Sequence, residues 1–120
     1  MKKSEVYRAA EAVVRSLEVP CSNLSMWQLI YGLELLHMDS ELIHGVTTRL
    51  YPKIAEMFPD ANGVGVERNL RAARDRIMDQ GNRDRLEEML GHPVRYSLSV
   101  ADLLDGIGFY LDRNGLWPDE

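Results

Sequence analysis

The segment Leu50–Gly81 constrains the fold of this chain more than any other part of the sequence. Pro52 suits the first turn of a short helix, because the N–H that proline lacks would have no partner there. That helix is expected to stop before Pro59. Asn62 is a typical N-cap, and it precedes a longer helical pattern over residues 63–80. The segment therefore predicts a short helix, a tight polar turn and a longer helix.

On a helical wheel, the apolar side chains of residues 63–80 separate from the charged ones. We expect the apolar stripe to pack on Ile54, Ala55 and Phe58 of the short helix, where the small Ala55 allows a close crossing. Two helices joined in this way form a helix-turn-helix, here over about residues 52–80. The side chains of the stripe, which fall within about 60° of each other, are Val66, Leu70, Ala73 and Ile77.

The rest of the chain also has apolar residues at helical spacing, and no alternating strand pattern extends beyond a few residues. We expect Gly81 to end one helix in a left-handed C-cap and Gly91 to close the next, and we expect Gly106 and Gly108 to mark close packing. The chain is predicted to be one all-α domain over residues 1–120, with six to seven helices around a central helix-turn-helix. The other helices are expected from a Ser4 cap to about Leu17, from a Ser25 cap to about His37, from Asp39 or Ser40 to about Leu50, from an Asn82 cap to Leu90, and from a Ser99 cap to about Arg113.

Length and composition exclude several classes of protein. The 120 residues suit one domain, and the longest uncharged run, Val19–Leu33, has 15 residues where a membrane-spanning helix needs about 20. We therefore expect no membrane contact and a cytoplasmic protein. The single cysteine, Cys21, excludes a disulfide within the chain and is interpreted as a small buried thiol. Trp27 is interpreted as a core residue, whereas Trp117 is expected either to be disordered or to dock on a partner.

No constellation of residues supports catalysis or metal binding. His37 and His44 are two helical turns apart and His92 lies in a different segment, so the three histidines do not form a ligand set. Glu87 and Glu88 are neighbours on a helix and point apart, which excludes a catalytic carboxylate pair. We expect no enzyme activity, no metal and no cofactor.

The charge pattern leaves two interpretations of the helix over 63–80. The net charge of −5 disfavours a generic nucleic-acid binder, but residues 51–85 carry 7 basic and 6 acidic groups. Glu67, Arg68 and Arg71 lie in the first turns of the helix, where arginine can pair with guanine and glutamate with cytosine in the major groove. The alternative is a solvated face with the ion pairs Glu67–Arg71 and Arg71–Asp75.

From about Val13 to Leu111, the sequence resembles the C-terminal effector domain of the stage-zero sporulation regulator A family. This family comprises response-regulator transcription factors of endospore-forming bacteria. The residues that carry the resemblance are Val19-Pro20, Asp39, Glu41-Leu42, Val46-Thr47, Leu50-Tyr51-Pro52, Ile54-Ala55, Phe58, Val66-Glu67-Arg68, Arg71-Ala72-Ala73, Gly81-Asn82, Leu90-Gly91 and Val94.

The resemblance implies a sequence-specific DNA-binding transcriptional regulator whose base readers are Glu67, Arg68 and Arg71 in the major groove. It also implies that two domains bind tandem sites as a homodimer through the last helix. No receiver domain is present in the sequence, so we expect phosphorylation control to lie outside this chain or to be absent. Weaker candidates for phosphate contacts are Thr48, Arg49, Lys53, Asn62 and Arg74.

The turn before Val66 departs from the family pattern. It reads Asn62-Gly63-Val64-Gly65 where the family usually has a Thr-Ala-Ser-Arg-like segment. Together with the acidic last third of the chain, this departure supports an alternative function. In that alternative, the chain is a divergent family member that has lost DNA binding and acts as a protein-interaction module.

Overall fold

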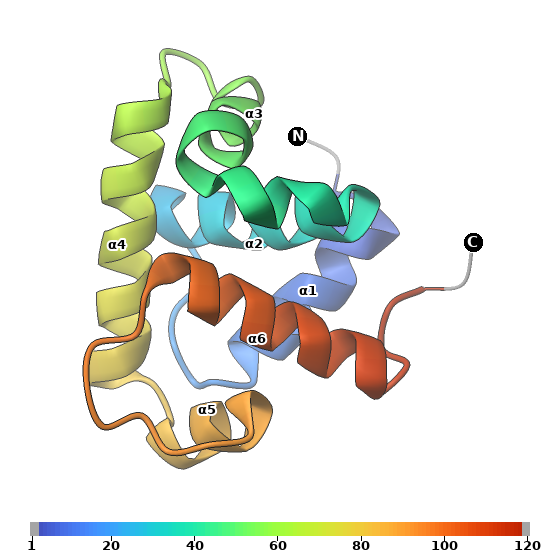
Figure 1. Ribbon diagram of the computed structural model, residues 1–120, viewed down its shortest axis with the longest axis vertical. Helices are drawn as coiled ribbons and strands as arrows, with labels where there is room; N and C mark the ends of the chain where they lie inside the picture. The colour runs from blue at the N-terminus through green and yellow to red at the C-terminus, as the bar shows by residue number, and fades with distance from the viewer. Residues whose placement is uncertain (1–2, 119–120) are drawn as a thin grey trace.

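The computed structural model describes residues 3–118, which form helices and connecting turns without a β-strand (Figure 1). This architecture confirms the all-α prediction. None of the described helices is long and apolar enough to cross a membrane. The elements are α1 (Glu5–Arg15), α2 (Leu24–Met38), the 3-10 helix η1 (Ser40–Gly45), the π-helix η2 (Val46–Leu50), α3 (Tyr51–Ala55), α4 (Gly63–Gln80), α5 (Arg83–Leu90) and α6 (Val100–Arg113).

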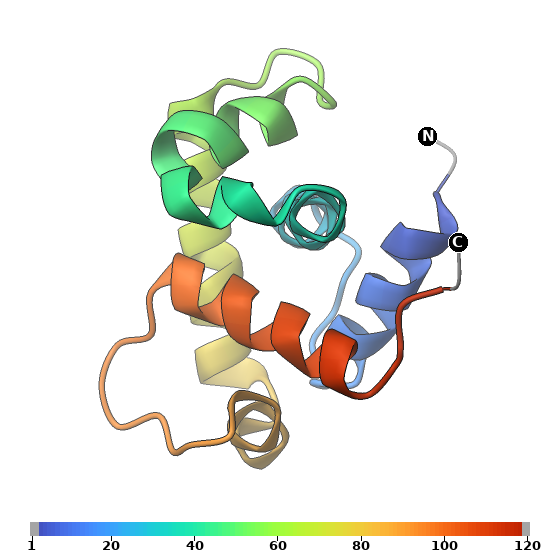
Figure 2. The ribbon, with the colours of Figure 1, turned by 45° about the vertical axis from the view of Figure 1, so that its right-hand side comes forward.

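Helix α2 lies at the centre of the fold. It packs against α1, α3, α4, α6 and η1, and Figure 2 shows it nearly end-on with these elements around it. Such an environment explains why its sequence is apolar nearly all round. Met26, Leu29 and Ile30 are fully buried, but the prediction that Trp27 is a core residue is wrong, because 40% of its surface is exposed. The neighbouring helices do not cover the side of α2 that carries Trp27.

The helix starts follow the capping chemistry with one exception. Predicted N-cap side chains accept hydrogen bonds from backbone N–H groups at four helices, with Ser4, Asn62, Asn82 and Ser99 as the caps. The prediction that Ser25 caps α2 is wrong. The cap is Asn23, whose extended backbone lets its side chain accept from the N–H of Met26 at 3.0 Å. Asparagine caps at least as well as serine, so the helix begins earlier and includes Ser25.

Residues 40–55 form two helical runs, but the break between them lies at Gly45 and not before Pro52, because the Gly45 backbone is non-helical with φ of −148° and ψ of 57°. Asp39 caps the start of the first run by accepting from the N–H of Glu41. Pro52 lies in the first turn of α3 as expected, but the backbone is already helical at Leu50. The N–H of Tyr51 donates to the carbonyl of Val46, five residues back, which is the wide spacing of a π-turn. The wide turn therefore carries the chain into the proline without a break.

Two glycines that end helices behave differently. Gly91 adopts the left-handed conformation, with φ of 80°, and this confirms a glycine closing α5. The predicted left-handed cap at Gly81 is wrong, because its backbone is extended. A Cβ at Gly81 would lie 2.5 Å from the carbonyl oxygen of Ile77 and 3.2 Å from that of Leu17. The next N–H, that of Asn82, donates to the Leu17 carbonyl at 2.7 Å, so glycine is required here by close packing.

Gly106 and Gly108 on α6 also differ. A Cβ at Gly106 would lie 2.2 Å from a methyl group of Leu90, so the predicted close packing is confirmed there. A Cβ at Gly108 would meet nothing within 4 Å, and the same prediction is wrong for that residue.

Cys21 is fully buried as predicted, and burial raises the pKa of its thiol above the ordinary value.

Candidate nucleic-acid interface

Helix α4 forms one side of the molecule and is held by α2 and α3 (Figure 1). The predicted apolar stripe is confirmed, because its four side chains are at most 1% exposed. On α3, Ile54 is fully buried and Ala55 nearly so. The opposite face of α4 is left to solvent, and it carries the residues predicted to read bases.

A partly buried hydrogen bond also joins α4 to α2. Gln28 is the one polar residue counted as buried among the described residues, at 1% exposure. Its side-chain oxygen accepts from the amide of Asn69 at 3.0 Å. A buried amide without a partner would be costly, so this bond favours one rotation of α4 about its own axis. Sequence reasoning missed the pair. The available signal was a glutamine within an otherwise apolar helix, which requires a partner once it is buried.

The turn between α3 and α4 is tight and polar. Asp60 takes a left-handed conformation with φ of 61°, and the N–H of Ala61 donates to the carbonyl of Phe58. Asn62 then caps α4 by accepting from the N–H of Gly65 at 2.8 Å. The other N–H groups in the first turn of an α-helix have no partner within the helix, and they can donate to a phosphate.

The three predicted base readers lie together on α4. Arg71 donates to the carboxylate of Glu67, which forms one of the two ion pairs expected for a solvated face. The other expected pair is absent among the described residues, because Asp75 pairs with Arg74 at 3.0 Å. The Arg71 side chain remains 61% exposed. Arg68 is exposed, and its guanidinium folds back toward the first turn of the helix.

The predicted phosphate contacts occupy three neighbouring elements. Thr48 and Arg49 are exposed on η2 and Lys53 is exposed on α3, and both elements pack against α4. Asn62 is exposed at the start of α4, where it also caps the helix. Arg74 is less available, because it is partly buried and paired with Asp75.

Tyr51 on α3 lies close to the charged side chains of α4. Burial is the main cause that raises the pKa of its hydroxyl above the ordinary value of 10.0. The charge of Glu67 acts in the same direction, while Arg71 and Arg74 act against it. The phenol therefore stays neutral beside α4, so it carries no negative charge that would compete with another anion for the arginines. The sequence placed Tyr51 in the motif but did not indicate this role.

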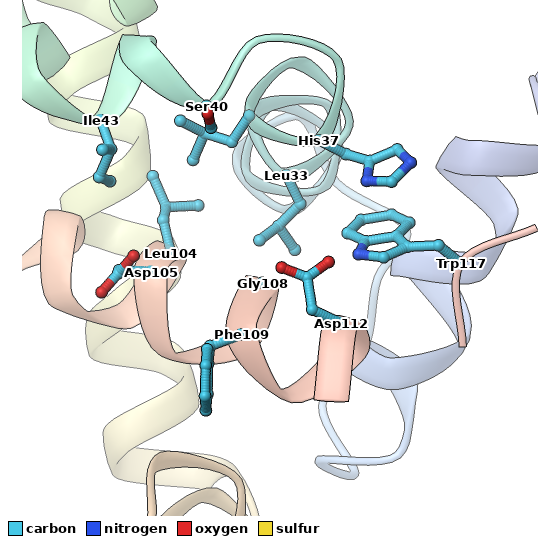
Figure 3. Close-up of a pocket in the computed structure, with 11 residues that line it drawn as sticks. Leu33, His37, Ser40, Ile43, Leu104, Asp105, Gly108, Phe109, Asp112 and Trp117 are labelled. Carbon is cyan, nitrogen blue, oxygen red and sulfur yellow. The ribbon is translucent and has the colours of Figure 1, made fainter. Parts of the chain in front are cut away.

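A separate pocket of about 210 Å³ lies between α2, η1 and α6 (Figure 3). There Trp117 stacks on His37 with the ring centroids 4.1 Å apart. The tryptophan is thus neither disordered nor free, because it packs on its own chain. The carboxylates of Asp105 and Asp112 also line the pocket. Within residues 3–118, no three histidine, cysteine or acidic side chains are grouped so that they could hold a metal ion.

One comparison with known proteins bears on this surface. The family model described as "Sporulation initiation factor Spo0A C terminal" matches residues 10–101. The matched segment contains the whole of α2, α3, the turn and α4. It ends at the second residue of α6, so most of that helix lies beyond the match.

Proposed function

The chain belongs to the Spo0A C-terminal family of DNA-binding sporulation regulators, and we propose that it recognises a specific DNA sequence through α3, the turn and α4. The family is one of regulatory domains and not of enzymes. The observation that carries the proposal is the exposed face of α4, where Glu67, Arg68 and Arg71 lie together on a helix fixed by α2 and α3.

The chemistry of these side chains suits base recognition. An arginine fork can donate to O6 and N7 of guanine, and a glutamate can accept from N4 of cytosine. Without DNA, Glu67 and Arg71 pair with each other. This pair is exposed and worth little by itself, so a base edge can replace either partner at small cost.

Phosphate contacts would orient α4 in the major groove. Lys53 and Arg49 present positive charge from the elements beside α4, and Thr48 and Asn62 offer polar groups. We assign Arg74 a weaker contact, because its guanidinium already forms an ion pair with the carboxylate of Asp75. Such contacts set position and salt dependence but carry no sequence information.

The first experiment is selection of a binding sequence from random duplexes, followed by affinity measurements across a salt series. Arg71→Ala is expected to weaken binding to the selected duplex by about 1–3 kcal/mol and to relax the preference at one base pair. Lys53→Ala is expected to weaken binding to all duplexes alike and to reduce the salt slope by about 1.

Arg8→Ala is the matched control, because Arg8 is an exposed arginine on α1, which packs against α2 and α6. It should leave the sequence preference unchanged. Weak binding that is equal for every duplex and unaffected by Arg71→Ala would contradict sequence-specific recognition.

A protein-interaction module without DNA binding is the second candidate. It is favoured by an apolar groove of about 430 Å³ between α1, α2 and the turn that follows α3. Leu24, Trp27 and Met57 line this groove, and each is 40–45% exposed. This candidate predicts that no duplex is selected and that a protein partner protects Trp27 from fluorescence quenching.

A further inference from the structure

Val64 is the most exposed apolar side chain on α4. It is 77% exposed, whereas Val66 two residues later is fully buried. A β-branched residue is a modest helix former, so an exposed valine in a helix is not explained by helix propensity. The buried stripe of α4 does not use it either. The position therefore requires a different explanation from that of the other apolar residues of the helix.

Helical geometry places Val64 on the same face as the predicted base readers. At about 100° per residue, Val64 and Arg71 lie within about 20° of each other, with Arg68 about 40° to one side and Glu67 about 60° to the other. The buried stripe is centred on nearly the opposite direction. Val64 is thus the apolar end of a row that continues with the charged readers.

The residues on either side of Val64 have no side chains. Gly63 and Gly65 flank Val64. The side-chain oxygen of Asn62 accepts from the N–H of Gly65 and does not cover the valine. A Cβ at Gly65 would be 3.4 Å from the Asn62 side-chain oxygen and 3.9 Å from the guanidinium of Arg68. With glycine there, the first turn of α4 can approach another surface closely. The side chain of Val64 would then be the first apolar group of the helix to reach that surface.

We propose that Val64 contacts the C5-methyl group of a thymine in the major groove and so determines one base of the recognised sequence. This inference rests on the proposed function. Among the four bases, thymine alone presents a methyl group in the major groove, and an apolar side chain gains nothing from the polar edges of the others. The N-terminal residues of a recognition helix are those that reach base edges.

The geometry also gives the distance between this thymine and its neighbours in the site. Val64 precedes Arg68 by one helical turn, or about 6 Å along the axis. Since base pairs are spaced by about 3.4 Å, the thymine should lie about two base pairs from the one that Arg68 contacts. A thymine at that spacing is the expected feature of the selected sequence.

The test replaces each thymine of the selected duplex by deoxyuridine, one position at a time, which removes only the methyl group. The wild-type chain should bind one of these duplexes about fourfold more weakly, as expected for loss of one buried methyl. Val64→Ala should bind that duplex and its parent equally. Met38→Ala, which alters an exposed apolar residue at the end of α2, should keep the wild-type difference.

Two results would overturn the contact while leaving sequence recognition intact. One is a selected sequence that tolerates deoxyuridine at every position or has no fixed thymine. The other is a Val64→Ala variant that retains the full deoxyuridine penalty. Failure to select any sequence would instead overturn the proposed function, and this contact with it. Circular dichroism of Val64→Ala would show whether α4 is intact in each case.

Discussion

At the scale of single residues, the hydrogen bond between Asn69 and Gln28 is a polar constraint on how the predicted readers are oriented. It is partly buried between α2 and α4, and it joins residues 41 positions apart in the sequence. Apolar packing is tolerant of small rotations, whereas a buried amide pair is satisfied in few arrangements. Asn69 directly follows Arg68, so a small rotation of α4 would move every reader relative to the groove.

Replacing both amides by leucine separates stability from orientation. Gln28→Leu combined with Asn69→Leu is expected to change the free energy of unfolding little, because no buried polar group is left without a partner. Either single replacement should destabilise by about 1–3 kcal/mol. The double variant should still bind DNA but discriminate about tenfold less between the selected duplex and a random one.

Chemical denaturation and competition binding would check these expectations. Ala72→Ser, on an exposed position of α4, is a suitable control for the binding assay. Unchanged discrimination by a folded double variant would show that packing alone orients α4.

At the scale of elements, the last third of the chain depends on how α6 rests on α5. Arg113 donates to the carbonyl groups of Glu88 and Met89 at 3.3 and 3.4 Å, which supports the end of α5. The guanidinium groups of Arg85 and Arg113 both lie over the ring of Tyr110. Gly106 allows the two helices to approach, and its counterpart Gly108 faces open space.

The two glycines give a matched pair of substitutions. Gly108→Ala is expected to stabilise the chain by about 0.5–1 kcal/mol, because alanine costs less backbone entropy in a helix and meets no neighbour. Gly106→Ala brings the same gain in propensity but forces the Leu90 side chain to move. It should therefore be less stable than Gly108→Ala by about 1–3 kcal/mol.

Thermal unfolding of both variants is the measurement. Equal stabilisation by the two alanines would mean that Leu90 moves aside freely and that α5 and α6 do not need the close approach.

At the scale of the whole molecule, basic and acidic residues are unevenly distributed along the chain. Residues 51–85 carry 7 basic and 6 acidic groups, whereas residues 86–120 carry 2 and 7. Helix α6 begins beside α4 and runs away from it (Figure 1). It exposes 60% of Phe109. The acidic end is unsuited to DNA. We propose that the exposed Phe109 contacts a second copy on tandem sites, as the family resemblance implies for the last helix.

Cooperative binding to duplexes with two selected sites tests this proposal. Phe109→Ser is expected to reduce cooperativity on tandem sites about tenfold, which is within the range measured for single interface side chains, and to leave affinity for one site unchanged. Tyr96→Ser, which alters an exposed aromatic in the loop before α6, should retain cooperativity. Equal cooperativity of both variants would exclude a contact through Phe109.

Much of the fold could be predicted because it depends on near neighbours in the sequence. The bounds of α4 and the buried stripe over Val66, Leu70, Ala73 and Ile77 follow from apolar spacing within one helix. The outward position of the predicted readers follows from the same spacing. The errors in local structure were small. At Ser25, the neighbouring Asn23 competed successfully for the N-cap of α2. At Gly81, the carbonyl of Leu17, distant in the sequence, lies so close that a side chain is excluded.

The sequence by itself determined where most of the helices lie, most of their N-caps and the face on which each charged residue lies, because these depend on residues within about one turn. Only the tertiary structure decided which side chains those faces meet. It left Trp27 exposed, paired Gln28 with Asn69 and stacked Trp117 on His37. Each of these outcomes depends on how separate helices cross, and the spacing within one helix carries no information about the crossing. The same crossing directs the exposed Val64 and the arginines of α4 outward together.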